Sequence, residues 1–143
     1  MKLHRSGSAA WSGGLQDGRG AISTQSGALN EYPYGFAARF EGQPGTNPEE
    51  LVGAAHAGCF TMALSLILGE AGFTADSMDT SAVVTLEQGE SGFSITESRL
   101  TLKAKIPGID DATFQELAGK AKANCPVSKL LKAELSLDAQ LLS

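Results

Sequence analysis

The pattern of hydrophobic and polar positions predicts three helices. The longest covers an uncharged run at residues 51–68 that is apolar on all sides, so we expect it to be buried. Asn47, Pro48 and Glu50 precede it in the order typical of a helix start: N-cap, first position and third position. We expect the helix to end at about residues 69–71, with Gly72 as the left-handed residue that stops it.

A second helix is expected after Asp110. Its apolar residues share one helical face: Phe114, Leu117, Ala118 and Ala121. It should end near Asn124, because Pro126 disfavours helical geometry in the residue before it. Pro126 is suited to begin a short third helix, PVSKLLK, with Cys125 at the N-cap.

The rest of the chain has the alternation typical of strands. Residues 82–87 and 93–106 predict a hairpin, and residues 135–141 predict another half-buried strand. Shorter strands are expected at residues 9–12, 20–24 and 36–40, among glycine-rich turns. The predicted fold class is α+β, with antiparallel β-sheet around a long central helix, in a single domain of residues 1–143.

Charge and composition exclude some functions. The net charge is −5 and there is no run of Lys or Arg, which argues against nucleic acid and against an anionic membrane surface. The N-terminal segment MKLHRSGSAAWSGG lacks the apolar core of a signal peptide, so we expect a cytoplasmic protein. Residues 51–68 are long enough to span a membrane, but they are rich in Gly and Ala, contain His56 and follow two glutamates, so we interpret them as core.

The two cysteines lie in unlike settings. Cys125 at a helix N-cap has N–H groups and a favourable dipole that would stabilise a thiolate. Cys59 is about three turns into its helix, where apolar burial would raise its pKa. The local sequence therefore favours Cys59 as a small core residue. It leaves open a structural disulfide, which is rare in the cytosol, a metal site, or a pair of attacking and resolving thiols.

A metal site is poorly supported. His56 and Cys59 share a helical face, and Cys125 would give only a third ligand, whereas closed zinc sites have four. No CxxC or HxxxH motif accompanies them. We therefore predict no metal and no other cofactor, and the alternative for His56 is a core histidine bonded to a carbonyl group.

Four segments carry a resemblance to a known family: TQSGALN, YPYGFAARFEG, GTNPEELVGAAHAGCFTMALSLILGEAGF and KAKANCPVSKLLKAE. Together they resemble the OsmC (osmotically inducible protein C) family of bacteria along essentially the whole chain, and its OsmC branch more than its organic-hydroperoxide-resistance branch. The resemblance implies a cysteine-based peroxidase that reduces organic hydroperoxides and hydrogen peroxide. It also implies an intertwined homodimer with active sites at the subunit interface, regenerated by an external dithiol or lipoyl-type reductant.

Carried over to matching positions, the resemblance makes Cys59 the peroxidatic thiol and Cys125 the resolving thiol. It makes Arg39, in FAARFEG, the cation beside Cys59, and Glu49, in NPEE, the carboxylate that holds Arg39. This reverses the local ranking of the thiols. It also requires that the guanidinium of Arg39 offset the burial of Cys59.

The spacing adds a hypothesis about the assembly. Glu49 and Cys59 are ten residues apart on one predicted helix, which is about 15 Å along its axis. The simplest geometry therefore brings Glu49, and with it Arg39, to the Cys59 site from the other subunit. Two alternatives to a peroxidase stay open at this point: a thiol redox sensor, and a small-ligand binding protein without turnover.

Overall fold

A computed structural model describes all residues from Met1 to Ser143, in two compact units. The first unit comprises Met1–Leu51 and the second Val52–Ser143. Each is described by itself. The prediction of a single domain stays a prediction.

The first unit contains a small antiparallel sheet in the order β1-β2-β3. Its elements are β1 (Gly7–Ser12), β2 (Arg19–Thr24), β3 (Tyr32–Tyr34) and the short helix α1 (Phe36–Phe40). The strands expected at residues 9–12 and 20–24 are confirmed, and β3 was missed. No apolar side chain of this unit is buried, although the rings of Trp11 and Tyr34 meet edge to face at 5.6 Å.

The strand expected at residues 36–40 is wrong, because this segment is α1. The N–H of Arg39 donates to the carbonyl of Gly35 and that of Glu41 to the carbonyl of Ala37, which closes a helical turn. A five-residue apolar run fits either a strand or one turn of helix. Ala37 and Ala38 favour the helix here.

The helix α2 (Pro48–Glu70) begins and ends as its sequence predicts. The Asn47 side chain accepts the backbone N–H of Glu50 at 2.8 Å, as an N-cap should. At the other end Gly72 has φ +88°, and the N–H of Phe73 returns to the carbonyl of Leu68 at 2.8 Å. This is a Schellman motif, and the side chains of Leu68 and Phe73 pack in the same hydrophobic cluster.

The second unit is built on a mixed sheet in the order β4-β5-β6. Its remaining elements are β4 (Ser77–Gly89), β5 (Gly92–Lys105), α3 (Asp111–Asn124), α4 (Pro126–Leu130) and β6 (Glu134–Leu142). The predicted hairpin is β4–β5, and α3 has the predicted bounds. α4 stops two residues earlier than expected. The expectation of a purely antiparallel sheet is wrong, because β6 runs parallel to β5.

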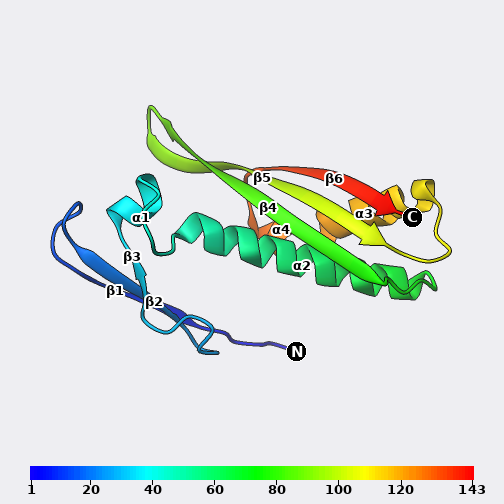
Figure 1. Ribbon diagram of the computed structural model, residues 1–143, viewed down its shortest axis with the longest axis horizontal. Coiled ribbons are helices and arrows are strands. Elements are labelled where there is room, and N and C mark those ends of the chain that lie inside the picture. Colours follow the sequence, from blue (N-terminus) through cyan, green and yellow to red (C-terminus); the bar gives the residue numbers. More distant parts are fainter. The chain divides into compact units, whose positions relative to one another are not determined.

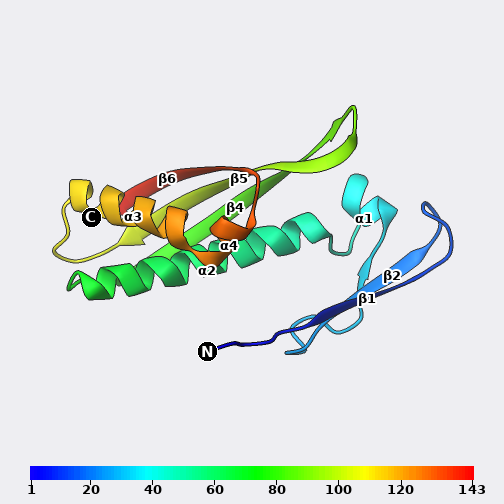
Figure 2. The same ribbon diagram turned by 180° about the vertical axis from the view of Figure 1, so that it is seen from behind.

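The parallel pairing follows from the connection between β5 and β6. The chain leaves β5, passes through α3 and α4, and returns as β6, and a crossover through helices joins parallel neighbours. In both views α2, α3 and α4 lie on one face of this sheet (Figure 1, Figure 2). The core lies between these layers, around Phe60 of α2, Leu102 of β5 and Phe114 of α3, all fully buried.

α2 is long and apolar enough to cross a membrane by length and composition alone, with a mean hydropathy of 1.8 over 18 residues. The core helix of a soluble protein passes the same test. Here α2 buries one stripe of residues against the second unit: Gly53, His56, Phe60, Leu64 and Leu68. Its opposite face is exposed, with Met62 at 77% and Leu66 at 64%. The expectation of a helix buried on all sides is therefore met on one side only within this chain.

The close approach of α2 to β4 gives the first prediction. A Cβ added at Gly53 would lie 3.0 Å from the carbonyl oxygen of Ala82, whereas one added at Gly69 meets nothing within 4 Å. Gly69→Ala should therefore raise the free energy of unfolding by up to about 1 kcal/mol through helix propensity. Gly53→Ala should leave the protein less stable than Gly69→Ala by about 1–3 kcal/mol, because the site is overpacked. Urea unfolding checks both, and equal effects would contradict the packing.

Candidate active site

The two thiols lie together in the second unit. Both cysteines are free, with Cys59 half-buried on α2 and Cys125 fully buried at the junction of α3 and α4. The thiol of Cys59 lies close enough to that of Cys125 for a charge on Cys125 to raise the pKa of Cys59, and Cys59 packs against the hydrophobic cluster that contains Cys125. Two residues 66 positions apart in the sequence are thus neighbours, as an attacking and a resolving thiol would have to be.

The N-terminus of α4 serves both sulfurs. Cys125 is the N-cap of this helix, as predicted, and its sulfur accepts the backbone N–H of Ser128 at 3.3 Å. The backbone N–H of Val127, in the same turn, lies near Cys59 and lowers the pKa of its thiol. Pro126 lies between them at the first helical position and has no N–H to offer. Backbone donors stabilise a thiolate, so the N–H of Val127 favours the charged form of Cys59.

Burial nevertheless keeps the pKa of Cys59 above its ordinary value. Loss of solvent is the largest cause, the N–H of Val127 lowers the pKa, and the neighbouring Cys125 raises it again. The net direction is upward. Within this unit Cys59 therefore holds its proton too firmly for a good nucleophile, and a further positive charge is needed to ionise it.

Next to the thiols, His56 joins two serine hydroxyls. Its Nδ1 lies 2.6 Å from the Oγ of Ser98 on β5, and its Nε2 lies 2.8 Å from the Oγ of Ser128 on α4. The Oγ of Ser128 is in turn 3.1 Å from the sulfur of Cys125. The expectation that His56 bonds a carbonyl group is wrong, because the helix directs its ring at β5 and α4, where hydroxyls occupy both nitrogens.

The other two predicted site residues meet in the first unit. The guanidinium of Arg39 forks onto the carboxylate of Glu49, with Nη2–Oε1 at 2.6 Å, Nε–Oε1 at 3.1 Å and Nε–Oε2 at 3.3 Å. Its carbon also lies 5.4 Å from the centre of the Phe40 ring. The side chain of Glu49 is 12% exposed and that of Arg39 36%. The fork fixes the guanidinium plane and leaves Nη1 for another acceptor.

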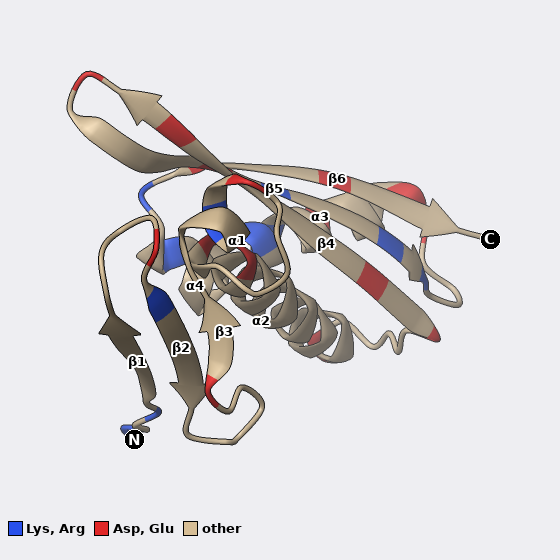
Figure 3. Ribbon diagram, turned by 60° about the vertical axis from the view of Figure 1, so that its left-hand side comes forward, with Lys and Arg blue, Asp and Glu red and all other residues tan.

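The four predicted residues thus form two pairs, one in each unit. Beyond its first turn α2 is almost free of charge, whereas β4 and β6 carry acidic residues and β5 carries both acidic and basic ones (Figure 3). No three His, Cys, Asp or Glu side chains gather as metal ligands.

The sequence analysis missed Ser98, Ser128 and the N–H of Val127. Ser128 could have been predicted, because an N-cap side chain accepts the N–H of the third helical residue, and Ser128 is the third residue of the helix that Cys125 caps.

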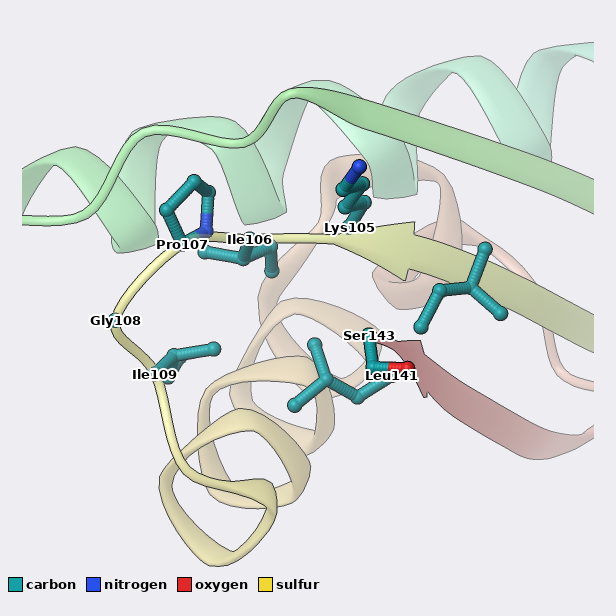
Figure 4. Close-up of a pocket in the computed structure, with 8 residues that line it drawn as sticks. Lys105, Ile106, Pro107, Gly108, Ile109, Leu141 and Ser143 are labelled. Carbon is teal, nitrogen blue, oxygen red and sulfur yellow. The ribbon is translucent and has the colours of Figure 1, made fainter.

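A hollow of about 390 Å³ lies at the other end of the sheet, where β5 turns into α3 beside the end of β6. Figure 4 shows Ile106, Ile109 and Leu141 lining it, with Pro107 and Gly108 in the connecting loop. It contains neither cysteine and no partner for one. The candidate site is therefore identified by its chemistry rather than by the shape of the surface.

Comparison with known proteins agrees with this geometry. The sequence model of the OsmC-like protein family matches residues 40–140. The chain is 57% identical to peroxiredoxin OsmC of Escherichia coli over 143 residues, which is all of both chains. It is 32% identical over 105 residues to the organic hydroperoxide resistance protein OhrB of Bacillus subtilis, covering 73% of this chain and 75% of OhrB. The higher identity to the OsmC protein confirms the branch that the sequence motifs favoured.

The crystal structure of the Bacillus subtilis OhrB is similar as well. It superposes with a TM-score of 0.67 at 30% identity, covering 96% of this chain and 98% of that one. The superposition covers nearly all of this chain, which confirms the α+β class.

The buried imidazole of His56 predicts a loss of stability in mild acid. Burial lowers the pKa of His56 below its ordinary 6.5. Between these two pKa values the unfolded chain binds a proton that the folded protein does not, so the stabilisation present above pH 6.5 is lost as the pH falls through the folded pKa. Urea midpoints of the wild type should therefore fall between pH 7.5 and the folded pKa.

His56→Gln should flatten that part of the pH dependence. His4→Gln, at the exposed second histidine, is the control and should keep the wild-type dependence. Identical pH dependence in the wild type and His56→Gln would contradict the assignment.

Proposed function

The chain belongs to the OsmC-like protein family, and on this basis we propose that it is a thiol-dependent peroxidase that reduces organic hydroperoxides and hydrogen peroxide. The observation that carries the proposal is the contact between a half-buried thiol, Cys59, and a fully buried one, Cys125. The names of its relatives, a peroxiredoxin and an organic hydroperoxide resistance protein, support the same activity.

The unequal exposure of the sulfurs supports their roles. A hydroperoxide has to meet the attacking sulfur in line with its O–O bond, so that sulfur needs an open side. Cys59 has one and Cys125 has none. Cys59 is therefore the peroxidatic thiol in our proposal, although α4 places its N-cap at Cys125. Cys125 needs to reach only the neighbouring sulfur, which it already contacts.

The proposed cycle uses only the two thiols and an external dithiol. The Cys59 thiolate attacks one peroxide oxygen, the O–O bond breaks, and an alcohol or water leaves. Cys59 is then a sulfenic acid, and Cys125 condenses with it to form a Cys59–Cys125 disulfide and water, which protects Cys59 from further oxidation. A dithiol or lipoyl-type reductant restores both thiols by exchange. We place this cycle in the cytoplasm, without metal or organic cofactor.

In this proposal Arg39 supplies the positive charge that stabilises the Cys59 thiolate. A permanently charged guanidinium beside the sulfur would lower the pKa that burial raises, and it would stabilise the negative charge that develops on the leaving oxygen. Glu49 would hold the guanidinium plane through the observed fork and leave Nη1 for the sulfur or the peroxide. Arg39 and Glu49 are thus the remaining site residues of the proposal.

We further propose that the protein is an intertwined homodimer in which Arg39 and Glu49 serve Cys59 of the partner subunit. Glu49 and Cys59 stand ten residues apart on α2, which is about 15 Å along a helix. The first unit buries no apolar side chain of its own, and α2 leaves Met62 and Leu66 exposed. Both features are typical of surfaces that a second subunit covers.

The roles of the thiols predict two different failures. Cys59→Ser should consume no cumene hydroperoxide, because no other group attacks the O–O bond. Cys125→Ser should consume about one equivalent per subunit and then stop at a sulfenic acid or a higher oxide. Peroxide consumption in the presence of a dithiol, with mass spectrometry of Cys59, measures both. Full turnover by Cys59→Ser would refute the assignment.

A mixing experiment tests the shared site. Arg39→Ala and Cys59→Ser should each be inactive alone. After the two are unfolded together and refolded, half of the dimers are mixed and each contains one complete site, so activity should return to about a quarter of the wild type.

Each variant refolded alone is the control, and native mass spectrometry counts the mixed dimers. Mixed dimers that form in the expected proportion without any activity would show that Arg39 serves its own chain.

A further inference from the structure

We propose that His56 and Ser128 form a proton relay for Cys125, in which Ser128 contacts the resolving sulfur and His56 is a positioning residue that accepts its proton through Ser128. The inference rests on the proposed function, because it concerns the step that closes the Cys59–Cys125 disulfide. It goes beyond it by giving the proton of the buried thiol a path.

The relay is a continuous chain of buried polar groups. It runs from Ser98 to His56 at 2.6 Å, from His56 to Ser128 at 2.8 Å, and from Ser128 to the sulfur of Cys125 at 3.1 Å. Ser98 and His56 are fully buried and Ser128 is 5% exposed. Solvent therefore has no direct route to the Cys125 proton, whereas the hydroxyl of Ser128 touches it.

One arrangement of protons satisfies every member of the chain. The thiol of Cys125 donates to the Oγ of Ser128, whose hydroxyl donates to the Nε2 of His56, while the Nδ1–H of His56 donates to the Oγ of Ser98. Ser98 thereby fixes the tautomer that leaves Nε2 free to accept, as a hydrogen bond to one ring nitrogen does for the other. A buried histidine that holds no proton at Nε2 is the base that this step requires.

Burial is the cause of the lowered pKa of His56. The nearest charges along β5, Glu97 and Arg99, pair with each other at 3.3 Å, and Lys129 on α4 is exposed. The titratable group that the chain contacts, besides His56 itself, is the thiol of Cys125.

Closure of the disulfide moves one proton from Cys125 to His56. The sulfur of Cys125 attacks the sulfur of the Cys59 sulfenic acid, the S–S bond forms, and the S–O bond breaks with its electron pair leaving on hydroxide. The thiol proton of Cys125 passes to Ser128 while the hydroxyl proton of Ser128 passes to Nε2 of His56. The imidazolium then releases a proton, and the hydroxide gains one and leaves as water.

The test separates the two steps of oxidation. Wild-type protein and variants are mixed with one equivalent of cumene hydroperoxide in quench-flow, and mass spectrometry follows the Cys59 sulfenic acid and the disulfide. Ser128→Ala keeps the backbone N–H to Cys125 but removes the relay. It should form sulfenic acid at the wild-type rate and close the disulfide more slowly by roughly 100-fold or more at pH 7, as loss of a general base does.

The pH profile distinguishes a relay from a structural role. Without an internal base the closing rate of Ser128→Ala should rise with hydroxide and approach the wild type at high pH. Ser98→Ala should show the same trend to a smaller degree, and Ser128→Thr, which keeps the hydroxyl, should restore the rate. Ser136→Ala, at a buried hydroxyl on β6 that has no partner, is the matched control and should close at the wild-type rate.

A wild-type rate and pH profile in Ser128→Ala, or equal slowing of both steps at every pH, would overturn the relay while leaving the peroxidase intact. Nitrogen chemical shifts of His56 in the reduced native protein give a test without substitution, and a proton found on Nε2 would also overturn it. A native protein that forms neither sulfenic acid nor disulfide would refute the proposed function, and the relay with it.

Discussion

The start of α4 is the feature on which the rest of the candidate site depends. Cys125 is both the last residue bonded into α3, through its N–H to Ala121, and the N-cap of α4. Pro126 holds Cys125 in an extended conformation and begins the new helix at once. The backbone N–H of Ser128 then donates to the sulfur of Cys125, and the backbone N–H of Val127 lies near the sulfur of Cys59. A junction of three residues, Asn124-Cys125-Pro126, thereby decides where both thiols lie and which donors they have.

The same placement of the two sulfurs raises the pKa of Cys59, which opposes formation of the attacking thiolate. Packing that brings the sulfurs together also removes water from Cys59, and this loss outweighs what the N–H of Val127 returns. A permanently charged group is the direct remedy, and Arg39 is already held in one plane by Glu49. The first unit and α2 also leave apolar surface exposed. A second subunit that covered this surface would exclude water around the guanidinium of Arg39, and the electrostatic stabilisation of the Cys59 thiolate would then be stronger.

Much of the fold could be predicted from local signals. Asn47, Gly72, Asp110 and Pro126 mark helix ends by backbone chemistry that acts over a few residues, and each was placed correctly. The errors occurred where contacts between distant residues decide the structure. The apolar pattern of residues 36–40 fits a strand and a helical turn equally well, and the direction of β6 depends on the crossover through α3 and α4 rather than on the alternation within β6. For the site, local reasoning favours Cys125 and the family resemblance favours Cys59 as the attacking thiol. The exposure of the two sulfurs and the position of the Val127 N–H bear on that choice, and both depend on packing that adjacent residues do not determine.

The coupling between the sulfurs also gives the reaction an order. Charge on Cys125 raises the pKa of Cys59, so the pair resists carrying two negative charges at once. While Cys59 is the attacking thiolate, a second negative charge on Cys125 would oppose it, so the relay of Ser128 and His56 is needed only after the attack. Once Cys59 has become a neutral sulfenic acid, the opposing charge has gone, and the proton of Cys125 is free to leave toward His56. The buried polar chain and the two sulfurs would then act in sequence, with each step removing the obstacle to the next.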